Sequence, residues 1–133
     1  MNIQDIEGIG ATYAAKFQGA DVQTTDDLLK KGGTSKGRAE LASATGLTEK
    51  QILEFVNRAD LYRIKGIGSE FADLLEAAGV DTVAELGNRN AENLAEKLKE
   101  VNAEKQKVRD LPSAGQLGKW IEEAKSLPRA VEY

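Results

Sequence analysis

Two short motifs of glycine and isoleucine carry the groups in this chain that are best suited to bind a ligand. Isoleucine lies between two glycines at Gly8-Ile9-Gly10 and again at Gly66-Ile67-Gly68. The glycines allow a tight turn with positive backbone angles, and the turn leaves backbone amides directed outward at the start of the helix that follows. Such amides, at the positive end of a helix dipole, favour a phosphate oxygen without reading any base. The chemistry expected of these motifs is anion binding.

Side chains suited to catalysis are scarce. The 133 residues include no histidine and no cysteine. This composition removes the commonest metal ligand, the thiolate nucleophile and the usual general base near neutral pH. Carboxylates, lysines and tyrosines are the side chains that remain to act as general acids or bases. We therefore expect no enzyme activity, no catalytic residue, no metal site, no cofactor and no small-molecule substrate.

The two motifs begin two copies of a longer repeat. The stretch from Ile6 to Gly10 recurs 58 residues later as Ile64 to Gly68. Further along, Thr48 to Ala59 parallels Ser113 to Ala124 at an offset of 65 residues, so the second copy has a longer middle. The first register also matches these pairs: Tyr13 with Phe71, Ala14 with Ala72, Phe17 with Leu75, Ala20 with Ala78, Val22 with Val80, Thr24 with Thr82 and Leu28 with Leu86.

The hydrophobic pattern predicts helices. Apolar residues recur at three- and four-residue spacing, and no segment alternates as a strand would. A hydroxyl residue followed three places later by an acid or amide predicts a helix N-cap, as at Thr24, Thr48, Thr82 and Ser113. Helices are expected near residues 11–19, 25–31, 36–44, 48–62, 69–78, 82–87, 90–100, 103–109 and 113–126.

The pattern apolar-x-Gly-Ile-Gly-x-x-x-Ala-x-x-apolar, found at Ile6 to Phe17 and at Ile64 to Leu75, is the helix-hairpin-helix pattern. We therefore expect an all-α fold of two tandem helix-hairpin-helix units packed as one compact body. Residues 1–62 would form the first unit and residues 63–133 the second, with a shared helix near 48–62.

Composition and charge limit the partners. Apolar residues make up 41% of the chain and charged residues 30%, a balance typical of a soluble globular protein. The sequence contains neither a signal-like N-terminus nor 18 consecutive apolar residues, so we expect a cytoplasmic protein with no membrane partner. The net charge is −4, which counts against tight wrapping of nucleic acid by the whole surface.

The chain resembles a bacterial family of tandem helix-hairpin-helix proteins that is known only as a domain of unknown function. The hairpin unit is also similar to those of DNA repair and recombination proteins, and to the C-terminal domain of the RNA polymerase alpha subunit, which contacts both DNA and protein. The resemblance implies the fold and leaves DNA and protein open as partners. The stretches that carry the family resemblance are Gly37 to Ala42, Asp60 to Gly68, Leu74 to Thr82, Arg89-Asn90 and Pro112 to Trp120.

One departure from the DNA-binding hairpins bears on function. Those hairpins often have a lysine two places after the second glycine, where this chain has Thr12 and Glu70. Glu70 would repel a phosphate, and Asp5 and Glu7 surround the first hairpin with negative charge. The second hairpin is therefore the preferred nucleic-acid site, with Gly8, Ile9 and Gly10 as a secondary hairpin. The candidate binding residues of the second hairpin are Arg58, Arg63, Lys65, Gly66, Ile67, Gly68 and Ser69.

Three other features have structural interpretations that we favour. The segment Lys30 to Arg38 carries four positive charges and no acid, but it also has the residues of two adjoining helix ends. The lysines between Lys97 and Arg109 alternate with glutamates, as on a solvated helical face. The aromatic residues at equivalent repeat positions are expected in the core: Tyr13, Phe17, Phe55, Phe71 and Trp120.

Two functions remain open from the sequence. The leading hypothesis is a non-catalytic module that binds DNA weakly, through phosphates and without sequence reading, at the second hairpin. The alternative is a protein-interaction adaptor without nucleic-acid binding, which the net negative charge and Glu70 favour.

Overall fold

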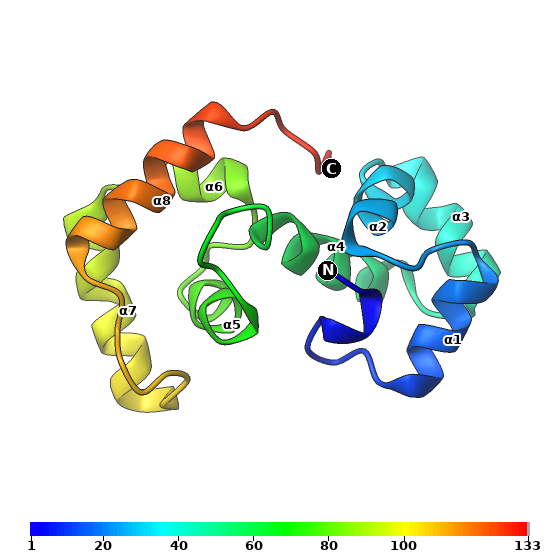
Figure 1. Ribbon diagram of the computed structural model, residues 1–133, viewed down its shortest axis with the longest axis horizontal. Helices are drawn as coiled ribbons and strands as arrows, with labels where there is room; N and C mark the ends of the chain where they lie inside the picture. Colours follow the sequence, from blue (N-terminus) through cyan, green and yellow to red (C-terminus); the bar gives the residue numbers. More distant parts are fainter. Residues whose placement is uncertain (133) are drawn as a thin grey trace. The chain divides into compact units, whose positions relative to one another are not determined.

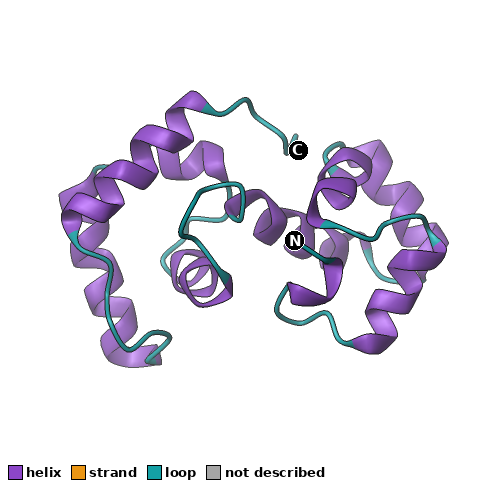
Figure 2. Ribbon diagram, in the orientation of Figure 1, coloured by secondary structure: helices purple, strands orange, loops and turns teal. Residues whose placement is uncertain are grey.

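The computed structural model describes residues 1–132, and within this range the chain forms helices and turns with no β-strand (Figure 1; Figure 2). The predicted all-α class is therefore confirmed. The chain divides into two compact units, one comprising Met1–Asp60 and the segment from Ala130, the other Leu61–Arg129. The packing of the two repeats into one body stays a prediction.

The first unit contains a short 3-10 helix and four α-helices, the last of which ends one residue beyond the unit. α1 and α2 both pack against α3, and the 3-10 helix η1 packs against α1 (Figure 1). Large side chains that are almost fully inaccessible form its interior, among them Ile3, Ile6, Phe17, Leu28 and Ile52. The elements are η1 (Ile3–Asp5), α1 (Ala11–Gly19), α2 (Thr25–Gly32), α3 (Ser35–Thr45) and α4 (Glu49–Leu61), of which Leu61 counts with the second unit.

The second unit contains four further helices, of which α7 is longer and α6 shorter than the matching helix of the first unit. α8 packs against α6 and α7, and α7 also packs against α5 (Figure 1). Leu74, Leu86, Leu94, Leu98 and Trp120 contribute to one buried cluster at the centre of this unit. The helices are α5 (Ser69–Ala77), α6 (Val83–Gly87), α7 (Ala91–Lys105) and α8 (Ala114–Ser126).

The helix predicted at residues 103–109 is wrong. α7 continues through this region to Lys105, because Val101 is buried and extends the apolar face of the helix. The helix ends at Lys105, and its C-cap residue Gln106 has a left-handed backbone with a φ of 49°. The Asn102 side chain forms hydrogen bonds with both backbone polar groups of Val108. It accepts from the Val108 amide at 3.0 Å and donates to the Val108 carbonyl at 3.1 Å. Each other predicted helix is present.

The predicted N-caps are also present. In α2, the Asp27 amide donates to Thr24 Oγ1 at 3.1 Å, and the Thr24 amide donates to Asp27 Oδ2 at 3.2 Å. In α4, Thr48 and Gln51 exchange the same two bonds at 3.1 and 3.0 Å. Each reciprocal pair satisfies amides that lack a partner inside the helix. Thr82 and Ser113 cap α6 and α8 through their hydroxyls.

Replacing Trp120 with alanine should lower the free energy of unfolding by about 3–5 kcal/mol, the usual cost of deleting a large buried aromatic side chain. Trp120 is only 3% exposed. Its ring meets the ring of Phe71 edge-to-face, with centroids 5.3 Å apart. Urea unfolding followed by circular dichroism measures the loss. Leu111→Ala is the control, because Leu111 is 38% exposed and its truncation should change stability little. An unchanged midpoint for Trp120→Ala would contradict this packing.

Replacing Asp27 with asparagine should lower the melting temperature near neutral pH. The Gln23 amide that donates to the carboxylate, helped by Thr24 and by the charge of Lys30, holds the pKa of Asp27 below its ordinary value. A carboxylate with a lowered folded-state pKa stabilises the fold above its unfolded pKa of about 4, and this contribution disappears as the pH falls through the folded value. The difference from wild type should therefore shrink on acidification below about pH 4.

Thermal melts of both proteins across this pH range provide the measurement. Asp26→Asn is the matched control, because it removes the same charge from the first turn of the same helix. If the Asp26 and Asp27 variants lose the same stability at every pH, the capping bonds are not the cause.

Candidate functional site

The two glycine-isoleucine motifs form turns of the same geometry. Gly8 and Gly66 have positive φ angles of 91° and 94°. In each turn the amide of the central isoleucine donates to the carbonyl of the isoleucine three residues earlier, at 3.1 Å in the first copy and 3.2 Å in the second. The central isoleucines, Ile9 and Ile67, are each 4% exposed, so both side chains are buried.

An aromatic ring lies behind the first glycine of each turn. A Cβ atom on Gly8 would lie 3.3 Å from Phe55 Cε1, and one on Gly66 would lie 3.2 Å from Trp120 Nε1. Phe55 and Trp120 occupy matching positions in the two copies. Glycine is therefore needed twice over at these turns, for its positive φ and for the approach of the ring.

The second glycine of each motif has a different role. Gly10 and Gly68 are the N-caps of α1 and α5, with extended backbones and no side-chain cap. A Cβ atom on either would meet nothing within 4 Å. Because neither N-cap has a side chain, the first amides of α1 and α5 receive no cap from it. These amides are the groups that could bind an anion.

The second turn borders a cleft of about 690 Å³. Lys65 and Lys119 bring positive charge to this cleft, and Glu123 brings negative charge. Glu123 Oε2 accepts a hydrogen bond from the Lys65 amide at 3.2 Å. One outward amide of the turn is therefore already bonded within the chain. The full lining comprises Lys65, Gly66, Ser113, Gly115, Gln116, Lys119, Trp120 and Glu123.

Sequence reasoning missed the part of this cleft that α8 supplies. A signal for it was present, because Trp120 matches Phe55 and the aromatic ring of the closing helix lies against the turn. Lys119 is adjacent to that ring in sequence, and Glu123 follows Trp120 by three residues, or about one helical turn.

The structure gathers only part of the predicted binding set. Lys65 and Gly66 share the cleft. Arg63 Nη2 instead donates to the Pro128 carbonyl at 2.7 Å. Ser69 Oγ lies 3.1 Å from the Tyr62 hydroxyl, with which it forms a hydrogen bond. Arg58 belongs to the first unit and does not line the cleft.

The additional residues of the second copy lie beside the start of α5. Glu70 and Phe71 share a cleft of about 560 Å³ with residues 106–110. Lys107 Nζ pairs with Asp73 Oδ2 at 3.0 Å, and Arg109 lines the same cleft. The prediction of a solvated helical face is therefore wrong for Lys107 and Arg109, because both follow the end of α7.

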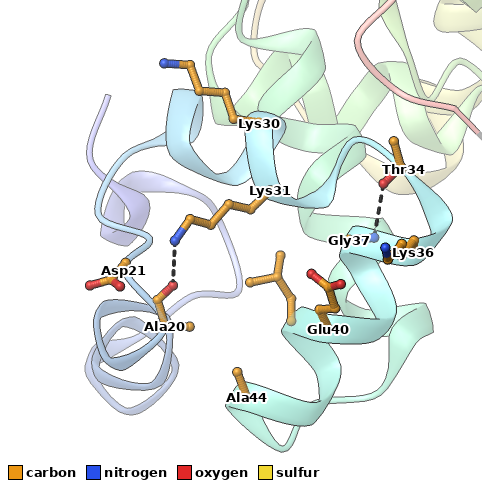
Figure 3. Close-up of a pocket in the computed structure, with 10 residues that line it drawn as sticks. Ala20, Asp21, Lys30, Lys31, Thr34, Lys36, Gly37, Glu40 and Ala44 are labelled. Atoms are coloured by element: carbon orange, nitrogen blue, oxygen red, sulfur yellow. Dashed lines mark hydrogen bonds between the residues drawn. The ribbon is translucent and has the colours of Figure 1, made fainter.

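The basic segment from Lys30 to Arg38 forms two helix ends, as expected. Thr34 caps α3 by accepting from the Gly37 amide at 3.0 Å. Lys31 Nζ donates to the Ala20 carbonyl at 3.0 Å, whereas Lys30 points away from this bond (Figure 3). The adjacent cleft, of about 540 Å³, also contains the acids Asp21 and Glu40. The positive charges of this segment therefore do not converge on one point.

Within residues 1–132, metal-ligand clusters and membrane-spanning helices are both absent. No group of three or more carboxylate, histidine or cysteine side chains in this range could hold a metal ion. None of the helices there is both long and apolar enough to cross a membrane.

Comparison with known proteins identifies the family. The model of the family described as "Domain of unknown function (DUF4332)" matches residues 7–127. No curated protein and no solved structure matches the chain. The family match includes both glycine turns and every helix from α1 to α8. The chain therefore belongs to this family, DUF4332, a domain of unknown function.

Proposed function

We propose that the two repeats are helix-hairpin-helix units and that the second binds the phosphate groups of nucleic acid, preferably DNA. The observation that carries the proposal is the uncapped start of α5. Gly68 is its N-cap and provides no side-chain hydrogen bond to the first amides of this nine-residue helix, and amides at a helix N-terminus favour an anion. A module of this kind binds without catalysis and without reading bases.

The charges beside the second turn support binding that is weak. Lys65 is exposed at the turn and Lys119 lies in the same cleft. Two acidic residues oppose these positive charges. Glu70 lies in the first turn of α5, and Glu123 accepts a hydrogen bond from the Lys65 amide. Only a few phosphates can be neutralised by such a surface, which favours low affinity and modest dependence on salt.

The first turn is proposed to act mainly in packing. Its backbone geometry matches that of the second, but its neighbouring charged side chains differ. Asp5 and Glu7 are both exposed acids close to Gly8 in sequence. Their repulsion would weaken a phosphate contact at the amides of α1.

The alternative proposal is a protein-interaction adaptor. The hydrogen bond from the Lys65 amide to Glu123 favours it, because this bond already satisfies one outward amide of the second turn. The net charge of −4 favours it too, since it opposes approach to a polyanion.

The nucleic-acid proposal predicts weak binding of duplex DNA at low salt. Fluorescence anisotropy of a labelled duplex should show log affinity falling with log salt at a slope of about 2–4, and base sequence should have little effect. Lys65→Glu should weaken binding, because it reverses the charge beside the turn. Lys97→Glu is the matched control, because Lys97 is exposed on α7 and lies outside the cleft.

The decisive outcome is the behaviour of the wild type at about 20 mM salt, where the screening length is about 20 Å. If neither DNA nor RNA changes the anisotropy there, the phosphate proposal is wrong and the adaptor becomes the leading function.

Removing the opposing acids should strengthen binding to DNA. Glu123→Gln preserves the shape and an acceptor oxygen but removes a negative charge from the cleft, and Glu70→Lys places a positive charge at the start of α5. Each should raise the affinity several-fold in the same anisotropy assay. Glu122→Gln is the control for Glu123, because it removes an equal charge from the neighbouring residue outside the cleft. Equal effects at positions 122 and 123 would indicate only a change of net charge.

A further inference from the structure

The segment that follows α8 lies against the junction between α2 and α3, and we call residues 130–132 the docked segment. The Glu132 amide donates to the Gly33 carbonyl at 2.7 Å. Arg38 Nη2 donates to the Glu132 carbonyl at 2.6 Å. Val131 is 2% exposed. A main-chain hydrogen bond, a hydrogen bond from the Arg38 side chain and one buried aliphatic side chain therefore help to hold the segment in place.

The receiving surface contains a buried cation. Arg38 is 6% exposed, and its Nη1 donates to the carbonyl of Gly32 at 3.0 Å. Gly32 is the last residue of α2, so the guanidinium lies at the negative end of that helix. The planar fork of arginine can hold this carbonyl and the Glu132 carbonyl together, which a lysine ammonium would not do with the same geometry.

Gly33 makes the close approach of the docked segment possible. A Cβ atom there would lie 2.5 Å from the Ala130 carbonyl oxygen and 2.7 Å from that of Leu29. Backbone atoms cannot yield as the end of a side chain can, so any larger residue would displace the segment. Gly33 and Arg38 together form a surface shaped for an extended main chain.

We propose that this surface, Gly33 with Arg38, is a binding site for an extended peptide in which a small residue precedes a buried aliphatic one. The docked segment fills the site within the chain, and a partner protein that presents a segment of this chemistry displaces it. The contacts are hydrogen bonds to the main chain of the segment plus the burial of one aliphatic side chain, and extended peptides are commonly recognised through their main chain and selected side chains. The Glu132 side chain is exposed, so the site selects at Val131 and not at Glu132.

Displacement is feasible because the docked segment owes its occupancy partly to its tether. A short tethered segment binds at an effective concentration in the millimolar range, so few contacts suffice to hold it and a better ligand can replace it. The proposal is independent of the nucleic-acid site, because it uses other residues in the other unit.

The test uses the full chain carrying Val131→Asp, which places a charge on the buried position and should release the docked segment. The probe is a fluorescent peptide amide with the sequence of residues 127–132, measured by anisotropy. It should bind the variant at least 10-fold more tightly than it binds the wild type, in which the tethered segment competes. The same peptide with aspartate in place of valine should not bind. Full-length Glu132→Gln is the matched control and should behave as the wild type does.

A second measurement covers the case in which Val131→Asp does not fold. In the wild type, hydrogen exchange of the Glu132 amide should accelerate when the unlabelled peptide is added in excess, because the peptide removes the Gly33 acceptor. Failure of the peptide to bind a folded variant, equal binding to variant and wild type, or unchanged exchange in the wild type would overturn the proposal. Dimerisation of the wild type through exchanged segments would also overturn it, because a second copy would then be the occupant.

Discussion

The contact between a glycine turn and an aromatic ring is the constraint on which each unit depends. At Gly66 the Trp120 ring lies so close to the backbone that a Cβ atom would be only 3.2 Å from Nε1. This contact fixes the distance between the turn and the closing helix, and it leaves the Ile67 side chain in the core. The turn that precedes α5 is thereby packed against α8. In the first unit Phe55 and Gly8 form the equivalent pair.

The two copies keep this backbone plan while their charged residues diverge. The first turn has Glu7 where the second has Lys65, and the closing helices carry Arg58 and Glu123 at matching positions. In the first unit the acidic residue is beside the turn and the basic residue is on the closing helix. In the second unit the basic residue is beside the turn and the acidic residue is on the closing helix. Packing depends on the shared apolar residues, so the surface charges can change without changing the fold. The two turns therefore differ in charge at equivalent positions.

Much of the fold was predictable because local signals coincide with the packing. The caps at Thr24 and Thr48 and the apolar spacing around Phe55 specify helices that the core also requires. The prediction failed beyond Glu100, where no glycine or proline interrupts the sequence and the end of α7 depends on Asn102 holding the backbone of Val108. That bond joins residues six apart in a loop, and no helical periodicity predicts it.

The candidate site was only partly predictable, for a different reason. The turn residues belong to a local motif, from which the burial of Ile9 and Ile67 and the positive φ angles of Gly8 and Gly66 follow. Glu123 reaches the Lys65 amide from a position 58 residues away, and Arg38 meets Glu132 across 94 residues. Contacts of this separation depend on how the helices pack, which the motif alone does not specify. Arg38 was assigned to a helix end, and its bond to the Gly32 carbonyl agrees with that assignment. The bond from Arg38 to the Glu132 carbonyl depends on the fold, and the local sequence does not predict it.

The pattern of helix caps separates α1 and α5 from the other helices of the described chain. Threonine, asparagine or serine side chains cap α2, α3, α4, α6, α7 and α8. α1 and α5 start at glycine and have no such cap. Steric need does not explain this choice, because a Cβ atom on Gly10 or Gly68 would meet no atom within 4 Å. Stability does not explain it either, since glycine at this position is slightly worse than serine, by a few tenths of a kcal/mol. A ligand that accepts hydrogen bonds and favours the positive end of a helix would explain it. Phosphate oxygens have these properties, which is why the start of α5, with Lys65 beside it, carries the proposed function.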